Sequence, residues 1–302
     1  MWMFDFILFY NSGSAILTGV SPYSLDLYYS PIFLALFFVP FSLLPMGLSY
    51  AVFLFINLFL AWKLLKSRIV WAVLFFPFLF SLFVGQVDFL LMALILLGSP
   101  WTIGLMLVKP QVSFVVIPWI VLSFSKKDWI KASISTALFI LLGSIIHPTW
   151  FIEWIATQPT FEYYARHASN LYWLIPSENI HFRSIVIFIG SIIVLPFGFL
   201  LTNRKDSWNI LHLFGPLTNI YSPVLLLEWI GPIEVSLSWL AVLLVGGNIH
   251  TGMPFFLVGV SIAVRSLLKY KKNVNKNLDS NDFLRPKIVI LIHKLYSKYT
   301  NE

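Results

Sequence analysis

Residues 47–66, GLSYAVFLFINLFLAWKLLK, decide what kind of protein this chain is. A helix of about 20 mostly apolar residues crosses the hydrocarbon core of a bilayer. Similar apolar runs occur near residues 30–44, 69–84, 87–98, 101–124, 130–147, 184–202, 207–231, 234–247 and 251–268. The pattern predicts an all-α polytopic membrane protein with about 10–12 transmembrane or half-membrane helices, plus interfacial helices.

The composition supports this interpretation. The chain has 302 residues, of which 59% are hydrophobic and only 11% are charged, whereas soluble domains carry about 25% charged residues. The spans leave no room for a separate soluble catalytic domain, so any chemistry takes place at the membrane. Because the chain has no cysteine, disulfides, thiolate metal sites and cysteine nucleophiles are excluded. No cleavable signal peptide is evident.

Basic residues predict the topology. Clusters at 63–68, 126–131, 204–205 and 265–272 are expected in the cytoplasm by the positive-inside rule. An even number of crossings then separates neighbouring clusters, which requires breaks at Lys109-Pro110 and near Ser222-Pro223, because proline interrupts the helical ladder. The intervening polar turns are all expected on the external face. Residues 30–44 either cross or lie flat or re-entrant at that face.

Two segments differ from the apolar runs. Residues 148–182 mix aromatic and ionisable side chains and are predicted to form an external interfacial loop. Residues 269–302 hold 8 of the 20 basic residues. They predict a cytoplasmic tail with a short amphipathic helix on anionic lipid, although a solvated tail is an alternative. We therefore expect a membrane-embedded domain over residues 1–268 and a basic tail over 269–302.

Ionisable groups inside or beside spans are expensive and become functional candidates. They are Asp5, Asp88, Lys109, Glu228 and His250. Asp5 lies between aromatic residues, where desolvation would make its carboxylate a better general base, or it could simply cap an interfacial helix. Lys109 could bind a phosphate or could snorkel to lipid headgroups.

Other kinds of site find little support. Four histidines are expected on the external face, but they lack the spacing of metal ligands, and we expect no metal and no cofactor. The chain has no nucleotide-binding motif, and its basic residues follow the membrane topology, so nucleic acid is not an expected partner. The external face is expected to carry only three cations, Lys109, Arg166 and Arg183, and so sparse a set suggests an anionic ligand.

Several motifs together resemble glycosyltransferase family 87, which belongs to the GT-C class of polytopic enzymes. They run from Asp5–Tyr10 through Gly19–Tyr23, Tyr29–Phe33 and Pro40–Pro45 to Gly85–Leu91, Gly104 and Lys109–Gln111, and more faintly to Tyr221–Pro223 and Glu228. The resemblance covers most of residues 4–231. It implies a transferase that takes a monosaccharide, commonly mannose, from a polyprenyl phosphate at the external membrane face.

The resemblance also implies roles for residues. An acidic residue just after the first span serves the family as general base, and Asp5 matches it. The family has a full transmembrane helix before this aspartate, whereas four residues precede Asp5, so we expect a shortened N-terminus. The family's later acidic position is usually aspartate, and here it is glutamate.

The expected enzyme is an inverting hexosyltransferase in the cell membrane. Its partners would be the polyprenyl-phosphate-sugar donor, membrane lipids, and a glycolipid, glycan or protein acceptor. Asp5 is the expected base, and the expected donor-phosphate ligands are Lys109 with Arg166 or Arg183. The residues expected to bind sugar or acceptor hydroxyls are Gln86, Asp88, Gln111, Tyr221, Glu228 and His250. A membrane transporter or lipid flippase is the alternative, because broken helices with ionisable residues also occur there. A structural subunit without activity is a third possibility.

Overall fold

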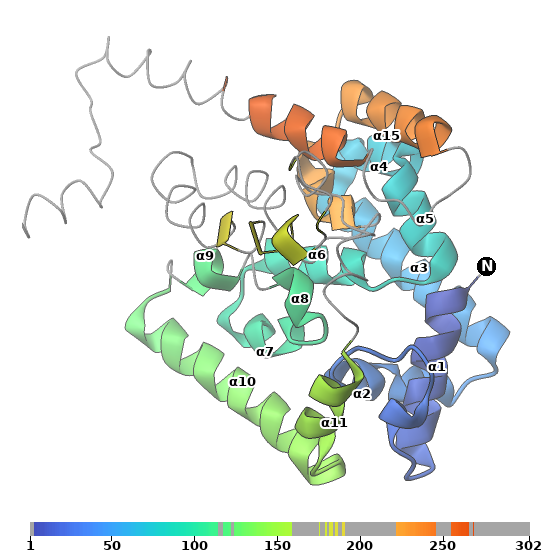
Figure 1. Ribbon diagram of the computed structural model, residues 1–302, viewed down its shortest axis with the longest axis vertical. Helices are drawn as coiled ribbons and strands as arrows, with labels where there is room; N and C mark the ends of the chain where they lie inside the picture. The colour runs from blue at the N-terminus through green and yellow to red at the C-terminus, as the bar shows by residue number, and fades with distance from the viewer. Residues whose placement is uncertain are drawn as a thin grey trace, which may run out of the picture.

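The computed structural model describes residues 3–113, 117–121, 124–158, 175, 179, 181–183, 185–186, 189–190, 222–245, 255–265 and 268. Within these residues the chain is helical and contains no strand, which confirms the all-α prediction (Figure 1). The elements are α1 (Phe4–Leu17), η1 (Pro22–Ser24), α2 (Ile32–Ser42), α3 (Met46–Leu65), η2 (Lys66–Arg68), α4 (Ile69–Leu74), α5 (Phe76–Val84), α6 (Asp88–Leu97), η3 (Pro100–Thr102), α7 (Ile103–Met106), α8 (Pro110–Ser113), α9 (Ile117–Val121), α10 (Lys126–Ile146), α11 (Trp150–Thr157), η5 (Ser222–Trp229), α15 (Pro232–Val245) and the helix Phe256–Arg265.

Two helices are long and apolar enough to cross a membrane. They are α10, with 21 residues, and the helix Met46–Leu74, with 29 residues, which combines α3, η2 and α4. A third candidate is the pair α5 and α6, which is bent by 114° at the break between them. The part of the chain that the structure describes thus holds two or three candidate spans, and the larger predicted number stays a prediction.

Several predicted runs have a different shape in the structure. The run 69–84 divides at Phe75, where the backbone is extended, so α4 continues α3 and α5 begins anew. The run 30–44 forms the 11-residue α2, which is shorter than a span. In the run 101–124, α7, α8 and α9 have 4, 4 and 5 residues. The predicted break at Lys109-Pro110 is confirmed, because α7 ends at Met106 and α8 begins at Pro110.

The two membrane-length helices approach α2 with opposite ends. The ring of Phe53, in the N-terminal half of α3, lies 5.8 Å from that of Phe38 in α2. The C-terminal end of α10 meets the start of α2, where a Cβ added at Gly143 would lie 2.8 Å from Ile32. Their basic clusters lie at the other ends, around Lys63 and Lys126. Both clusters therefore lie at the helix ends away from α2, and their cytoplasmic location stays a prediction.

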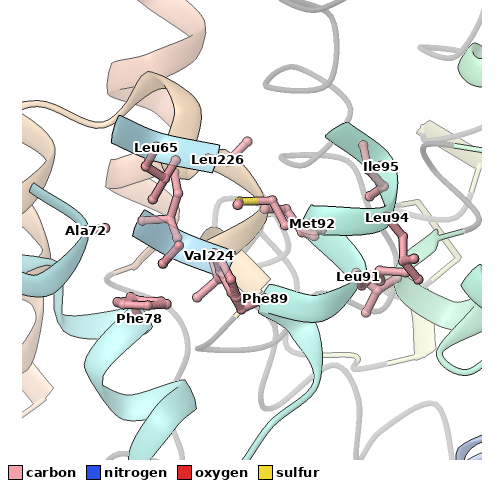
Figure 2. Packing of buried hydrophobic residues seen from close by; sticks show 14 of the residues in the cluster. Leu65, Ala72, Phe78, Phe89, Leu91, Met92, Leu94, Ile95, Val224 and Leu226 are labelled. Carbon is pink, nitrogen blue, oxygen red and sulfur yellow. The ribbon is translucent and has the colours of Figure 1, made fainter. Parts of the chain in front are cut away.

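Two packed clusters hold the fold together. The larger one centres on α6, whose Phe89 and Met92 pack with Leu65 of α3 and with Val224 and Leu226 of η5 (Figure 2). The second joins α1, α2 and the first half of α3 through residues such as Phe6, Phe38 and Phe53. Since lipid is as apolar as these side chains, close packing rather than burial from water holds such helices together. The turn between α5 and α6 joins the two clusters, since Val87 belongs to the second cluster and Phe89 to the larger one.

The predicted cytoplasmic tail 269–302, and the domain boundary before it, lie outside the described residues. Of the predicted loop 148–182, the structure describes α11 and a few single positions.

Candidate active site

Asp5 stands in the first turn of α1 and faces the turn between α5 and α6. The N–H of Met3 donates to the carbonyl of Phe83 at 3.1 Å, which ties the start of α1 to the end of α5. The next residue, Phe6, is fully buried against Tyr50 and Phe53, with ring centroids 5.0 and 5.5 Å away. These contacts hold the Asp5 carboxylate next to Gln86, whose Nε2 donates to Asp5 Oδ2 at 2.6 Å.

The α5–α6 turn depends on Gly85. This residue has a φ of 82°, the left-handed region that favours glycine, and ends α5. A Cβ at this position would lie 2.3 Å from Cβ of Phe6, so only glycine lets α1 come this close. The close approach places the buried Gln86 side chain between α1 and the turn before α8.

Gln86 bridges Asp5 and Lys109. Its Oε1 accepts from Lys109 Nζ at 2.9 Å, while its Nε2 donates to Asp5. An ammonium can only donate, so Lys109 fixes the orientation of the amide and turns its NH2 group toward the carboxylate. Lys109 itself lies in the turn between α7 and α8.

Lys109 also forms a buried ion pair. Its Nζ lies 2.5 Å from Asp88 Oδ2, and the side chains of Lys109 and Asp88 are 9% and 0% exposed. Asp88 begins α6, where the helix dipole favours a negative charge. Its second oxygen, Oδ1, is buried with no hydrogen-bond partner in the structure as described. A buried carboxylate oxygen left in this way points to a water or a ligand hydroxyl as its partner.

The electrostatic environment of Asp5 suits a base. Desolvation raises its pKa from 3.8 to about 6; the hydrogen bond from Gln86 and the charge of Lys109 oppose this rise, while the charge of Asp88 adds to it. The side chain is nevertheless only half-buried, so a substrate can reach it. A partly accessible carboxylate that titrates near pH 6 is well matched to proton abstraction near neutral pH.

The structure thus brings together four of the predicted site residues, Asp5, Gln86, Asp88 and Lys109. We call these four side chains the carboxylate–lysine chain. Gln111 lies in α8 and Glu228 in η5, but their side chains are not among those described.

The structure does not test the other predicted site residues, which include two arginines assigned to the donor phosphate. The N–H of Arg183 donates to the carbonyl of Asn179 at 3.1 Å, and its assignment to donor phosphate stays a prediction. Arg166, Tyr221 and His250 lie outside the described residues.

Sequence reasoning missed a second polar cluster, around Glu153 of α11. This carboxylate accepts from Ser21 Oγ at 2.6 Å and from Thr149 Oγ1 at 2.5 Å, and lies 3.0 Å from His147 Nε2. The hydrogen bonds from Ser21, Thr149 and His147 lower its pKa from 4.5 to about 2. No spacing rule joins Ser21 to a residue 132 positions later. The cluster ties the α1–α2 connection to α11.

No metal centre is apparent in the described portion of the chain, where no three His, Asp or Glu side chains gather as potential ligands.

Comparison with known proteins gives one match. The family model described as Glycosyltransferase family 87 matches residues 28–193, which is more than half of the chain. The match is narrower than the resemblance over residues 4–231. It contains Gln86, Asp88 and Lys109 but neither Asp5 nor Glu228. No curated protein and no solved structure matches the chain.

Proposed function

The chain belongs to glycosyltransferase family 87 and is a membrane glycosyltransferase, and on this premise we propose that it transfers a hexose, mannose by the family resemblance, from a polyprenyl-phosphate donor to an extracytoplasmic acceptor. The acceptor would be a glycolipid, a glycan or a protein. The observation that carries the proposal is the carboxylate–lysine chain, which links a desolvated carboxylate to a buried cation through one amide.

In the proposed step, an acceptor hydroxyl attacks the anomeric carbon of the donor sugar. Asp5 takes the hydroxyl proton as the new C–O bond forms. The bond between the anomeric carbon and the phosphate oxygen breaks, and the polyprenyl phosphate leaves with the bonding electron pair. Attack opposite the phosphate inverts the anomeric centre. Asp5 fits the role of base because its pKa of about 6 makes it a stronger base than an exposed aspartate.

Lys109 is the proposed ligand of the departing phosphate, together with Arg166 or Arg183. A positive charge placed where negative charge develops stabilises the transition state. Asp88 holds the ammonium in place before the donor binds, because the two side chains form a buried ion pair. The proposed partners of sugar or acceptor hydroxyls are Asp88, whose Oδ1 has no hydrogen-bond partner in the structure as described, and Gln86. Gln111, Tyr221, Glu228 and His250 are proposed for the same task.

The arrangement of the spans supports an external active face. Phe6, next to Asp5, packs on Tyr50 and Phe53 in the first two turns of α3, far from the basic end of that helix. If the basic ends face the cytoplasm, the carboxylate–lysine chain lies toward the outside. We propose a multi-pass protein of the cell membrane with a cytoplasmic tail.

Orientation can be tested with single cysteines, since the chain has none of its own. Ser24 and Ser67 are both exposed serines, one in the connection after α1 and one beside the basic end of α3. In intact cells a membrane-impermeant maleimide should label Ser24→Cys but not Ser67→Cys. The reverse labelling pattern would overturn the proposed orientation.

The activity test is transfer of radiolabelled mannose from polyprenyl-phosphate-mannose into membrane lipids by the purified protein, with GDP-mannose as the alternative donor. Asp5→Asn should abolish transfer and leave donor binding intact. Asp26→Asn is the matched control, because Asp26 is an exposed carboxylate in the α1–α2 connection, and it should transfer at the wild-type rate. Equal transfer by wild type and Asp5→Asn would remove Asp5 as the base, and transfer from GDP-mannose alone would overturn the donor class.

A further inference from the structure

An exposed row of aromatic side chains runs along α3 toward its basic end. Phe55, Phe59 and Trp62 are 68%, 43% and 57% exposed. The rings of Phe55 and Phe59 stack with centroids 6.0 Å apart, and the ring of Trp62 lies 6.0 Å from that of Phe59. Their spacing of four and three residues places them on one face of the helix. The row extends about 10 Å along the helix axis.

The row ends in three cations. Lys63 Nζ lies 5.7 Å from the ring centroid of Phe59 and 5.1 Å from that of Trp62, within the range of a cation–π interaction. Lys66 and Arg68 follow directly and are exposed. The sequence contains no Asp or Glu between Asp26 and Asp88, so no acidic residue close in sequence offsets the positive charge at this end of α3.

The depth of these groups in the bilayer follows from the length of α3. Its 20 residues span about 30 Å, which matches the hydrocarbon core. The helix is interrupted at Lys66, whose φ of 51° leaves the α-helical region. Although α4 continues the helix to Leu74, charged side chains are costly in the hydrocarbon core, which favours a position of the three cations at headgroup level and of the aromatic row beside the acyl chains.

We propose that the basic end of α3 is a binding site for an anionic phospholipid. The phosphate of the headgroup contacts Lys63, Lys66 and Arg68, and an acyl chain lies along Phe55, Phe59 and Trp62. Charge complementarity selects an anionic lipid over a zwitterionic one, while the exposed aromatic row favours a lipid over a soluble anion. The proposal does not depend on the transferase activity.

The start of α10 provides an internal control. Lys126, Lys127 and Lys131 also form a cluster at the end of a membrane-length helix. However, Asp128 lies among them and pairs with Lys131 at 3.3 Å, which reduces the local charge. Among the described residues beside this cluster, Trp129 is exposed but is not part of a stacked aromatic row like that of α3.

The test is lipid retention by the full-length protein in nanodiscs of phosphatidylcholine and phosphatidylglycerol. Bound lipid is counted by native mass spectrometry after mild delipidation. Each surface cation contributes about a fivefold gain in affinity for anionic lipid. K63Q/K66Q/R68Q is thus expected to bind phosphatidylglycerol about 100-fold more weakly. K126Q/K127Q/K131Q is expected to lose less, about 25-fold, because Asp128 already offsets one of its three charges. If the triple variant does not fold, K63Q alone should still show about a fivefold loss.

Two outcomes would overturn the proposal. One is retention of phosphatidylcholine as strong as that of phosphatidylglycerol, which would leave a nonselective lipid surface. The other is an equal loss of phosphatidylglycerol in the two triple variants, which would assign binding to general charge rather than to the α3 site. The two proposals fail separately: absence of mannose transfer with normal lipid retention would count against the proposed function and would support the lipid site.

Discussion

Gly85→Ala tests whether the close approach of α1 to the α5–α6 turn creates the active site. Two effects act at this position. The left-handed φ of 82° costs an alanine about 1–2 kcal/mol. In addition, the new Cβ would lie 2.3 Å from Cβ of Phe6, whereas carbon atoms pack at about 3.5 Å, so α1 has to move by about 1.2 Å. A shift of that size would lengthen the 2.6 Å bond between Gln86 and Asp5 beyond hydrogen-bonding range.

Gly19→Ala is the matched control. Gly19 has a φ of 70° but no atom within 4 Å of an added Cβ, so it incurs the backbone cost without the collision. We expect Gly85→Ala to lower the free energy of unfolding by about 1–3 kcal/mol more than Gly19→Ala does, because overpacking destabilises a site by this amount. A displacement of about 1 Å at a reacting group lowers the rate about 100-fold. Thermal unfolding in detergent and the rate of mannose transfer measure the two effects. Wild-type transfer by Gly85→Ala, with the same melting temperature as Gly19→Ala, would refute the reasoning.

Three further results are expected. Because Asp5 must be deprotonated to act as base, kcat/KM should fall as the pH drops below a midpoint near 6. Gln86→Leu removes a hydrogen bond that lowers the Asp5 pKa, so it should move this midpoint to higher pH. An unchanged midpoint would argue against Asp5 as the titrating group. Asp88→Asn removes the ion-pair partner of the buried Lys109 and should cost about 3–5 kcal/mol in unfolding free energy, whereas the double variant Asp88→Leu/Lys109→Met should cost less. A double variant less stable than Asp88→Asn would contradict the expected coupling of the two side chains. Glu153, whose pKa is lowered to about 2, stabilises the fold above pH 4.5. Glu153→Gln should therefore lower the melting temperature at pH 7, and the difference in melting temperature from wild type should shrink as the pH falls from 4.5 toward 2. A difference that does not change with pH would exclude this contribution.

The membrane class and the break at Lys109-Pro110 could be predicted because they depend on local properties. A run such as 47–66 has the length and composition of a span wherever it stands in the fold. The break at Lys109-Pro110 follows from the chemistry of proline. The division of the run 69–84 at Phe75 was not predicted, although Pro77 marks it in the sequence: proline is favoured in the first turn of a helix, and it stands there in α5.

Part of the site could also be predicted. Ionisable residues in apolar surroundings stand out, and this signal found Asp5, Asp88 and Lys109 without any contact information. It did not show that Gln86 joins Asp5 to Lys109, nor did it find the cluster around Glu153. Those side chains are neutral or lie in polar segments, where a single residue carries no distinctive signal.

The sequence alone was enough to identify a helical membrane protein, and it predicts which segments are apolar enough to cross and which charged residues are candidates for a function. Hydrophobicity and proline chemistry act over a few residues, and so they can be read along the chain. The contact between Gln86 Nε2 and Asp5 Oδ2, at 2.6 Å and 81 positions apart in sequence, appears only in the folded structure. That contact requires α1 to close on a glycine with a left-handed backbone, and such a fit arises from the packing of whole helices.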